Sequence, residues 1–211
     1  MIKTIEGLTP ENEFLETLGQ KISTCSNEVT VAKLDIDNFE TVNRFYGEYI
    51  GDQVIRKLAH VLVKNLKKEM KVCRTYKDEF TVLMDGTPRD TGALMIEEIR
   101  AYFDEHLLLV GDPAKEISIC LSAGIASFPQ NGKTVEELME AVERALKTAK
   151  STGKNQVMTA KNDTWVEKKI MIRHETADQL NELSRRMDIT EAGLMREALQ
   201  DLFKKYHQST G

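Results

Sequence analysis

The hydrophobic pattern of the chain changes near residue 160, and this change limits the folds that the chain can adopt. Before it, amphipathic helical patterns alternate with short strand patterns rich in Val and Ile. The run RTYKDEFTVLM at 74–84 predicts two strands joined by a tight turn. We therefore predict an α/β (α+β) sandwich with this antiparallel hairpin at its centre for residues 1–160, a linker at 161–166 and a second domain at 167–211.

Two long runs in the first part are each predicted to be a single element. The run TGALMIEEIRAYFDEHLLL at 91–109 predicts one helix, and EISICLSAGIASFP at 116–129 predicts one strand. A strand is also predicted at 28–36, where EVTVAKLDI is rich in Val, and QVMTA at 156–160 predicts one more short strand. The alternation favours a sheet covered by helices.

The last part of the chain holds one strand pattern and two helix patterns. EKKIMIRH at 167–174 predicts the strand, and the runs at 176–187 and 191–206 predict helices, the second capped by Thr190. Units of about 40 residues bury too little apolar surface to fold alone. We therefore predict that this part pairs with a second copy of itself, which makes the chain a homodimer.

Composition limits the partners and the location of the chain. The formal net charge of −5 gives no general attraction to nucleic acid or membrane, so any such contact must be local. The cysteines Cys25, Cys73 and Cys120 stand far apart without the spacing of metal ligands, which indicates reduced core thiols in a cytoplasmic protein. The N-terminus lacks a signal-peptide pattern, and no apolar run of about 18 residues is present to enter a membrane.

Acidic side chains fall at the ends of two predicted strands. Asp35 comes near the end of the first strand, and Asp78 lies in the hairpin turn beside Glu79. If these strands are neighbours, the carboxylates converge and suit Mg²⁺, a hard cation that leaves room for phosphates. The helix that begins at Asn38 and Phe39 would offer backbone N–H groups to a phosphate. The alternative is that these acids only solvate a strand end and a turn.

Four segments resemble, in order and spacing, the motifs of the GGDEF family, the diguanylate cyclases. They are LDIDNFETVNRFYGEYIGDQVIRKLA (34–59), RTYKDEF (74–80), SAGIASFP (122–129) and ALKTAKSTGKNQV (145–157). The resemblance implies the palm-like fold of nucleotide polymerases. It also implies a reaction that joins two GTP molecules into cyclic di-GMP, with one GTP on each of two facing domains.

The resemblance assigns a role to each matching position. The Mg²⁺ ligands would be the carboxylates of Asp35 and Asp78 and the carbonyl of Ile36, and Glu79 matches the second acid of the motif. If the chain is an active nucleotidyltransferase, Asp35, Asp78 and Glu79 would be its catalytic acids. The nucleotide-binding positions are Asn43 and Asp52 at the guanine edge, Lys150 and Lys154 at the phosphates, Asn38 and Phe39 in the phosphate cradle, and Lys77.

Several positions depart from the family pattern. Tyr76 and Lys77 stand where the motif has two glycines, which let the backbone approach the nucleotide and take φ > 0. Glu40 replaces a lysine beside the phosphate cradle, and one misplaced charge at about 4 Å costs about 4 kcal/mol at an effective dielectric near 20. These departures predict weak or absent cyclisation. The metal and guanine positions that match the family predict that nucleotide binding is retained.

The tail resembles the ribbon-helix-helix family of DNA-binding dimers, in which two strands pair and enter the major groove. Alternation along KKIMIRH predicts that Lys169, Met171 and Arg173 face DNA, while the intervening isoleucines enter the core. Thr190 would hold a backbone phosphate at the start of the second helix. The alternative is a dimerisation module with a solvated basic strand.

Three functions are consistent with the sequence. The first is a dimeric DNA-binding transcriptional regulator whose GGDEF domain senses a guanine nucleotide, either GTP or cyclic di-GMP. The second is an active diguanylate cyclase whose tail serves for dimerisation or DNA tethering. The third is a structural pair of domains without either activity.

Overall fold

The computed structural model describes residues 5–24, 28–67, 69–161, 171–187 and 191–207. The chain divides into two compact units, one from Met1 to Thr164 and the other from Trp165 to Gly211. The linker predicted at 161–166 lies almost wholly outside the described residues. Its bounds, and those of the two domains that it would join, stay predictions.

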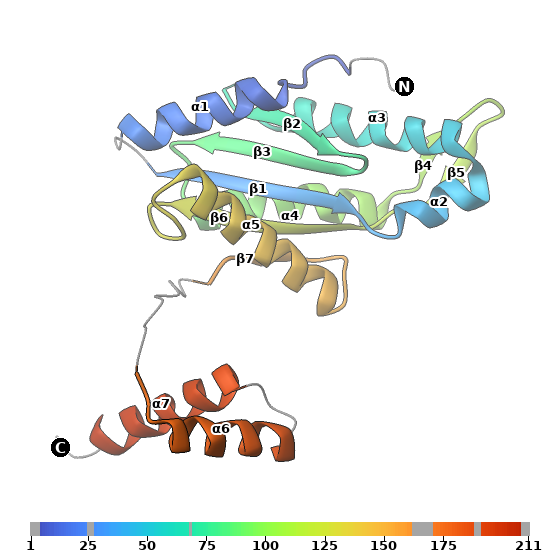
Figure 1. Ribbon diagram of the computed structural model, residues 1–211. Coiled ribbons are helices and arrows are strands. Elements are labelled where there is room, and N and C mark those ends of the chain that lie inside the picture. Colours follow the sequence, from blue (N-terminus) through green and yellow to red (C-terminus); the bar gives the residue numbers. More distant parts are fainter. Residues whose placement is uncertain (1–4, 25–27, 68, 162–170, 188–190, 208–211) are drawn as a thin grey trace. The chain divides into compact units, whose positions relative to one another are not determined.

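The N-terminal unit contains a five-stranded sheet with the order β2-β3-β1-β6-β7 (Figure 1). β1 is antiparallel to β3 and β6, β2 is antiparallel to β3, and β6 is parallel to β7. The strands are β1 (Val29–Ile36), β2 (Lys71–Tyr76), β3 (Glu79–Asp85), β6 (Leu121–Phe128) and β7 (Val157–Thr159). The prediction of a central hairpin was wrong: β1 is the middle strand of the five, and the hairpin strand β2 lies at one edge of the sheet.

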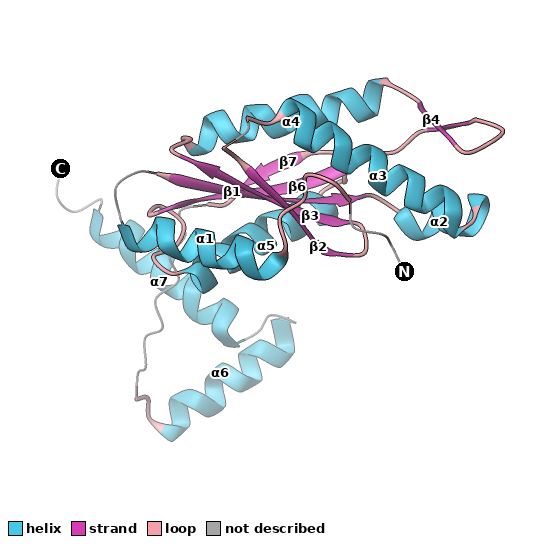
Figure 2. Ribbon diagram, turned by 90° about the horizontal axis from the view of Figure 1, so that it is seen from above, coloured by secondary structure: helices cyan, strands magenta, loops and turns pink. Residues whose placement is uncertain are grey.

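Helices cover both faces of the sheet (Figure 2). α1 (Glu11–Thr24) and α5 (Val135–Ser151) pack on one face, and α3 (Glu48–Asn65) and α4 (Arg89–Glu105) pack on the other. β1 divides its side chains between the two, since Val31 packs with α1 and α5 whereas Leu34 packs with α3 and α4. The short helix α2 (Phe39–Tyr46) connects β1 to α3.

The region between α4 and β6 differs from the sequence expectation. The helix ends at Glu105, and β4 (Leu108–Val110) pairs with β5 (Lys115–Ile117) in a small separate sheet. The predicted helix over 91–109 is therefore too long, and the predicted strand over 116–129 is two strands. Gly111, with a φ of 88°, supplies the turn between β4 and β5. The sequence analysis missed this turn because the run of leucines before it continues the helical pattern.

Of the cysteines, Cys73 is buried in this unit, Cys120 is partly exposed, and both are free thiols. Cys25 lies outside the described residues. None of the described helices is long and apolar enough to cross a membrane.

The C-terminal unit contains the two predicted helices, α6 (His174–Met187) and α7 (Glu191–His207). His174 begins α6, whereas the sequence placed it at the end of a strand. Lys169 and Thr190 lie outside the described residues, so their predicted DNA contacts stay predictions. Met171 and Arg173 are exposed and are not assigned to a strand. A ribbon strand is defined by its hydrogen bonds to the partner copy, which one chain cannot supply.

The apolar stripes of these helices are largely exposed in a single chain. α6 has no buried residue, and Leu194 is the only buried apolar side chain among the described residues of this unit. Leu199 and Leu202 of α7 are 51% and 47% exposed. This exposure is what the prediction of a paired tail requires.

Candidate nucleotide site

A cavity of about 670 Å³ lies where β1 ends, between the β2–β3 turn and the start of α2. Its lining includes every residue that the sequence assigned to the metal and the nucleotide: Asp35, Ile36, Asn38, Phe39, Asn43, Asp52, Lys77, Asp78, Glu79, Lys150 and Lys154. The fold therefore brings together positions that are up to 119 residues apart in the sequence, as 154 minus 35 gives. Their individual roles stay predictions.

The acidic end of the cavity lies on the face of the sheet that α5 covers. Asp35 is directly opposite Glu79 in the register of β1 and β3, and Asp78 lies in the turn just before Glu79. The Asp35 side chain is 7% exposed, and its carboxylate pairs with Lys150 Nζ of α5 at 2.6 Å. Burial raises the pKa of Asp35 to about 6, with a further contribution from Asp78. Burial also raises the pKa of Asp78. Cation binding would relieve the charge concentrated here.

Asp35→Asn is expected to stabilise the protein in the absence of metal and nucleotide. With a folded pKa of about 6 against an ordinary 3.8, the ionised carboxylate opposes folding by about 3 kcal/mol. This penalty is absent below pH 3.8 and grows as the pH rises to 6. At about pH 7.5, denaturant unfolding should show that Asp35→Asn has a free energy of unfolding about 2 kcal/mol higher than the unaltered chain. This difference should shrink progressively between about pH 6 and pH 4.

The control is Asp90→Asn, which changes a carboxylate that is 86% exposed. It should leave the free energy of unfolding unchanged across this pH range. Equal effects of the two substitutions would contradict the assignment of an unfavourable, buried charge to Asp35.

Glu79 is held by a lysine that the sequence analysis missed. Lys33 Nζ lies 2.8 Å from a carboxylate oxygen of Glu79 and 2.6 Å from one of Glu143 on α5. The Lys33 side chain is only 14% exposed. The sequence did contain a signal for this pair, since Lys33 lies within the Val-rich run of β1. A lysine buried in such a strand requires an acidic partner. Glu79 is therefore already paired on the α5 side of the cavity.

The phosphate end of the cavity is formed by the turn before α2 and the loop after α5. Asn38 has a φ of 56° and precedes Phe39, the first residue of α2. Lys154 Nζ donates a hydrogen bond to Asn38 Oδ1 at 2.6 Å. A helix N-terminus with a lysine beside it provides both N–H donors and positive charge for an anion. Glu40 also lines this end and opposes that charge.

The opposite end contains Asn43 and Asp52, from α2 and α3. Asn43 Oδ1 is buried and has no hydrogen-bond partner among the described residues. This oxygen lies against Gly51, where the Cβ of any larger residue would collide with it. An Asn with an unpaired buried atom is a costly arrangement that suits a residue kept for a ligand.

Tyr76 and Lys77 form part of the cavity wall and do not fill it. Tyr76 is 61% exposed, and Lys77 Nζ lies 5.5 Å from the centre of its ring. The register shifts between Arg74 and Tyr76, and no residue of this turn, all of which the structure describes, has a positive φ. Both side chains line the cavity, and their effect on the approach of a nucleotide stays a prediction. Their effect on the preferred glycine turn is as expected.

Three charged residues of the lining were not mentioned in the sequence analysis: Asp37, Glu48 and Arg74. Arg74 Nε donates to the carbonyl of Lys77 at 2.8 Å and so fixes the turn. Asp37 is buried and accepts a hydrogen bond from Ser122 Oγ at 2.8 Å. Its position two residues after Asp35, in the run DID, was the signal available.

The donor set fits a hard cation only in combination with a ligand. Among the described residues, no group of three His, Cys, Asp or Glu side chains lies close enough to hold a metal ion. The predicted donors are the two carboxylates of Asp35 and Asp78 and the carbonyl of Ile36. Mg²⁺ commonly takes one or two carboxylates and completes its shell with water and phosphate oxygens.

The sheet with helices on both faces and the polar cavity at the end of β1 define the class of palm-like domains. Residues 6–156 match the model of the GGDEF domain of diguanylate cyclases, and residues 168–207 match that of the ribbon-helix-helix domain. Because the first match covers more than half of the chain, the chain belongs to the GGDEF family. Both predicted resemblances are confirmed, and so is the predicted fold class.

Curated relatives resemble part of the chain. The response regulator PleD of Caulobacter vibrioides is 27% identical over 68% of this chain and 32% of its own length. The diguanylate cyclase DgcP of Pseudomonas aeruginosa is 30% identical over 74% of this chain and 23% of its own length. The chain thus spans about a third or less of these relatives.

A solved structure supports the fold directly. The GGDEF domain of DgcB from Caulobacter crescentus, in complex with c-di-GMP, has a TM-score of 0.70 and 25% identity. The match covers 75% of this chain and 94% of that chain.

Proposed function

We propose that the chain is a dimeric DNA-binding transcriptional regulator whose GGDEF domain binds a guanine nucleotide with Mg²⁺. The observation that carries this proposal is the convergence of the predicted metal, phosphate and base-edge residues on one cavity. The same chain carries a ribbon-helix-helix domain. Nucleotide occupancy would then tune DNA binding by the tail.

The distribution of charge along the cavity suits a nucleotide. Carboxylates of Asp35 and Asp78 stand at one end with Lys150 beside them. In this proposal Mg²⁺ would neutralise the nucleotide phosphates between these acids, while Lys150 and Lys154 contact the terminal phosphates. Asn43 and Asp52 would meet the guanine edge, where a carboxylate accepts from the N1–H and exocyclic amine that adenine does not present together.

Calorimetry with GTP, GDP, ATP and cyclic di-GMP tests this proposal in the presence of Mg²⁺. We expect binding of at least one guanine nucleotide and at least tenfold weaker binding of ATP. Asp52→Ala should reduce the affinity for the guanine nucleotide by about 10-fold or more, because hydrogen bonds to charged groups contribute about 1.5–3 kcal/mol.

The control is Asp90→Ala, which removes an exposed acid that does not line the cavity. This variant should bind each nucleotide with the same affinity as the unaltered chain. No heat and no thermal shift with any of the four nucleotides would overturn the sensor proposal.

The case for DNA rests on the tail. Met171 is fully exposed and Ile172 is 45% exposed, which agrees with a strand that alternates between a DNA-facing and a core-facing side. Arg173 is also exposed, and a guanidinium can bind a guanine edge through two hydrogen bonds. The net charge of −5 makes this local basic ribbon necessary for any DNA contact.

Arg173→Ala is expected to weaken binding to the preferred DNA sequence by about 1–3 kcal/mol and to relax sequence preference at one position. Fluorescence anisotropy with preferred and scrambled duplexes would measure both effects. The matched control is Arg185→Ala, an exposed arginine in the last turn of α6. An unchanged affinity after Arg173→Ala would indicate a tail that serves only for dimerisation.

A second candidate function is diguanylate cyclase activity. The specific observation in its favour is that Tyr76 and Lys77 leave the cavity open. Against it, Glu79 is paired with Lys33, and Glu40 opposes the phosphates. Incubation with GTP and Mg²⁺ followed by product analysis separates the two candidates.

A further inference from the structure

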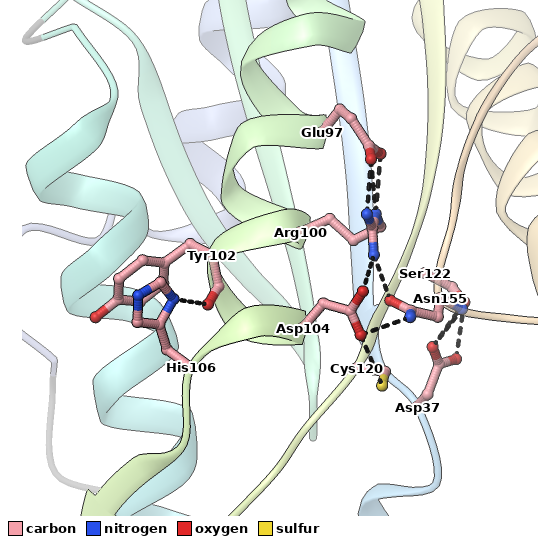
Figure 3. Close-up of polar contacts among 9 residues, drawn as sticks. All are labelled: Asp37, Glu97, Arg100, Tyr102, Asp104, His106, Cys120, Ser122 and Asn155. Atoms are coloured by element: carbon pink, nitrogen blue, oxygen red, sulfur yellow. Dashed lines mark hydrogen bonds and ion pairs between the residues drawn. The ribbon is translucent and has the colours of Figure 1, made fainter.

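A cluster of polar side chains lies on α4 and the loop after α5, outside the lining of the nucleotide cavity. We call Glu97, Arg100, Asp104 and Asn155 the α4 cluster (Figure 3). Arg100 donates to both carboxylate oxygens of Glu97 at 2.8–3.0 Å and to Asp104 at 3.2 Å. Its Nη1 also donates to Asn155 Oδ1 at 2.7 Å. The Arg100 side chain is 13% exposed, so these bonds are partly shielded from water.

Asn155 connects this cluster to the turn at the end of β1. Its Nδ2 donates to Asp104 Oδ1 at 2.9 Å, and its backbone N–H donates to Asp37 Oδ2 at 2.9 Å. Ser122 on β6 donates to the same Asp37 carboxylate. Both side-chain ends of Asn155 and its backbone amide are therefore fixed by residues from α4 and the β1–α2 turn.

The loop that carries Asn155 has an uncommon backbone conformation. Lys154 and Asn155 have φ angles of 63° and 46°, although neither is glycine. Consecutive left-handed residues of this kind persist only where surrounding contacts enforce them. The Lys154 backbone N–H bonds to the carbonyl of Ala149, and its amine reaches Asn38 Oδ1 at 2.6 Å. The held conformation thus places the Lys154 amine beside the start of α2.

We infer that Arg100, Asp104 and Asn155 are positioning residues that hold the Lys154 loop and thereby give the cavity its preference for nucleoside polyphosphates over monophosphates. This inference rests on the proposed nucleotide-binding function. None of the three residues lines the cavity, so they act through Lys154 and Asn38, which do. The guanine edge contacts of Asn43 and Asp52 come from α2 and α3 and do not depend on this loop.

The consequence for ligands differs between the two ends of the cavity. Releasing the loop removes a fixed positive charge from the phosphate end, because an exposed lysine on a mobile loop must be ordered again on binding. A nucleoside monophosphate, anchored by its base and one phosphate, loses little from this release. A triphosphate loses a contact to its terminal phosphates.

Amide hydrogen exchange of the full chain tests whether the cluster holds the loop, and it needs no nucleotide. In Arg100→Met, the amide of Asn155 is expected to exchange at least about fivefold faster than in the unaltered chain, because local opening exposes its bond to Asp37. The matched control is Arg144→Met on α5, which removes an arginine paired with Glu140, both more than half exposed. Unchanged exchange in Arg100→Met would overturn the positioning role.

Calorimetry with GTP and GMP tests the preference itself. Arg100→Met and Asn155→Gly should each weaken GTP binding by about tenfold and change GMP binding by less than about twofold. Asn155→Gly removes the side-chain bonds and still permits the left-handed backbone, so it serves if Arg100→Met fails to fold. Arg144→Met should bind both nucleotides as the unaltered chain does.

Two outcomes overturn the inference and one identifies a different failure. Equal losses of affinity for GTP and GMP would mean that the cluster only supports the structure in general. Unchanged GTP affinity would mean that the cluster has no role in nucleotide binding. If the unaltered chain binds neither GTP nor GMP, the preference fails, and the proposed function fails as well when GDP and cyclic di-GMP also do not bind. The exchange measurement then still decides separately whether the α4 cluster holds the loop.

Discussion

A chain that ends after residue 160 is expected to be monomeric and to lose all sequence-specific DNA binding. The physical reason is the exposure of the tail helices in a single chain, where α6 has no buried residue and Leu199 and Leu202 remain about half exposed. A unit of this size needs a partner to bury such stripes. Light scattering at micromolar concentration would measure the mass, and anisotropy with duplex DNA would measure the affinity.

A point substitution separates loss of the dimer from loss of the tail. Leu202→Asp in the full chain should also give monomers, because it places a charge in the predicted dimer core. Leu94→Asp is the matched control, since Leu94 on α4 is 66% exposed in the N-terminal unit. A truncated chain that remains a dimer would contradict the assignment of dimerisation to the tail and move it to the GGDEF domain.

The second large effect concerns conversion of GTP to cyclic di-GMP. We expect slow or undetectable synthesis by the unaltered chain and at least a tenfold increase in Tyr76→Gly/Lys77→Gly. Glycines at these positions permit a turn with φ > 0, so the backbone can approach the nucleotide without the register shift that now lies between Arg74 and Tyr76. The paired tail would supply a second nucleotide-bearing domain at high effective concentration. Chromatography of reaction mixtures with GTP and Mg²⁺ measures the product.

The matched control retains the bulk at both positions. Tyr76→Phe/Lys77→Arg should remain at the level of the unaltered chain, since neither substitution restores the glycine turn. Restored glycines that improve GTP binding without product would indicate that the tail holds the two domains in an orientation unsuited to the reaction. Rapid synthesis of cyclic di-GMP by the unaltered chain would show that Tyr76 and Lys77 belong to a working active site. The proposal of a cyclase would then replace the proposal of a regulator.

Local patterns predicted most of the secondary structure. β1 lies where the Val-rich run predicted a strand, and both tail helices lie where the apolar periodicity predicted helices. The errors occurred where periodicity was ambiguous. The leucines at 107–109 continue a helical composition, yet Leu108 is buried and Leu109 is 65% exposed, as alternation in a strand requires.

The candidate site was predictable only through motif order. The resemblance to the GGDEF family assigned Asp35, Asp78, Asn43 and Asp52 to one site, and all four line the same cavity. Spacing could not reveal that Lys33 pairs with Glu79 and Glu143, because these residues lie on three elements distant in the sequence. Nor could it reveal the register shift between Arg74 and Tyr76 at the end of β2.

Periodicity and motifs read along the chain were sufficient to predict the two families, most of the elements and the residue types of the site. Only the folded chain reveals which strand is central, which acids are buried and paired, and which side chains of α4 contact the Lys154 loop. The reason is that burial, charge pairing and left-handed backbone conformations depend on contacts between segments far apart in the chain. A local sequence pattern does not show which distant segments will come into contact.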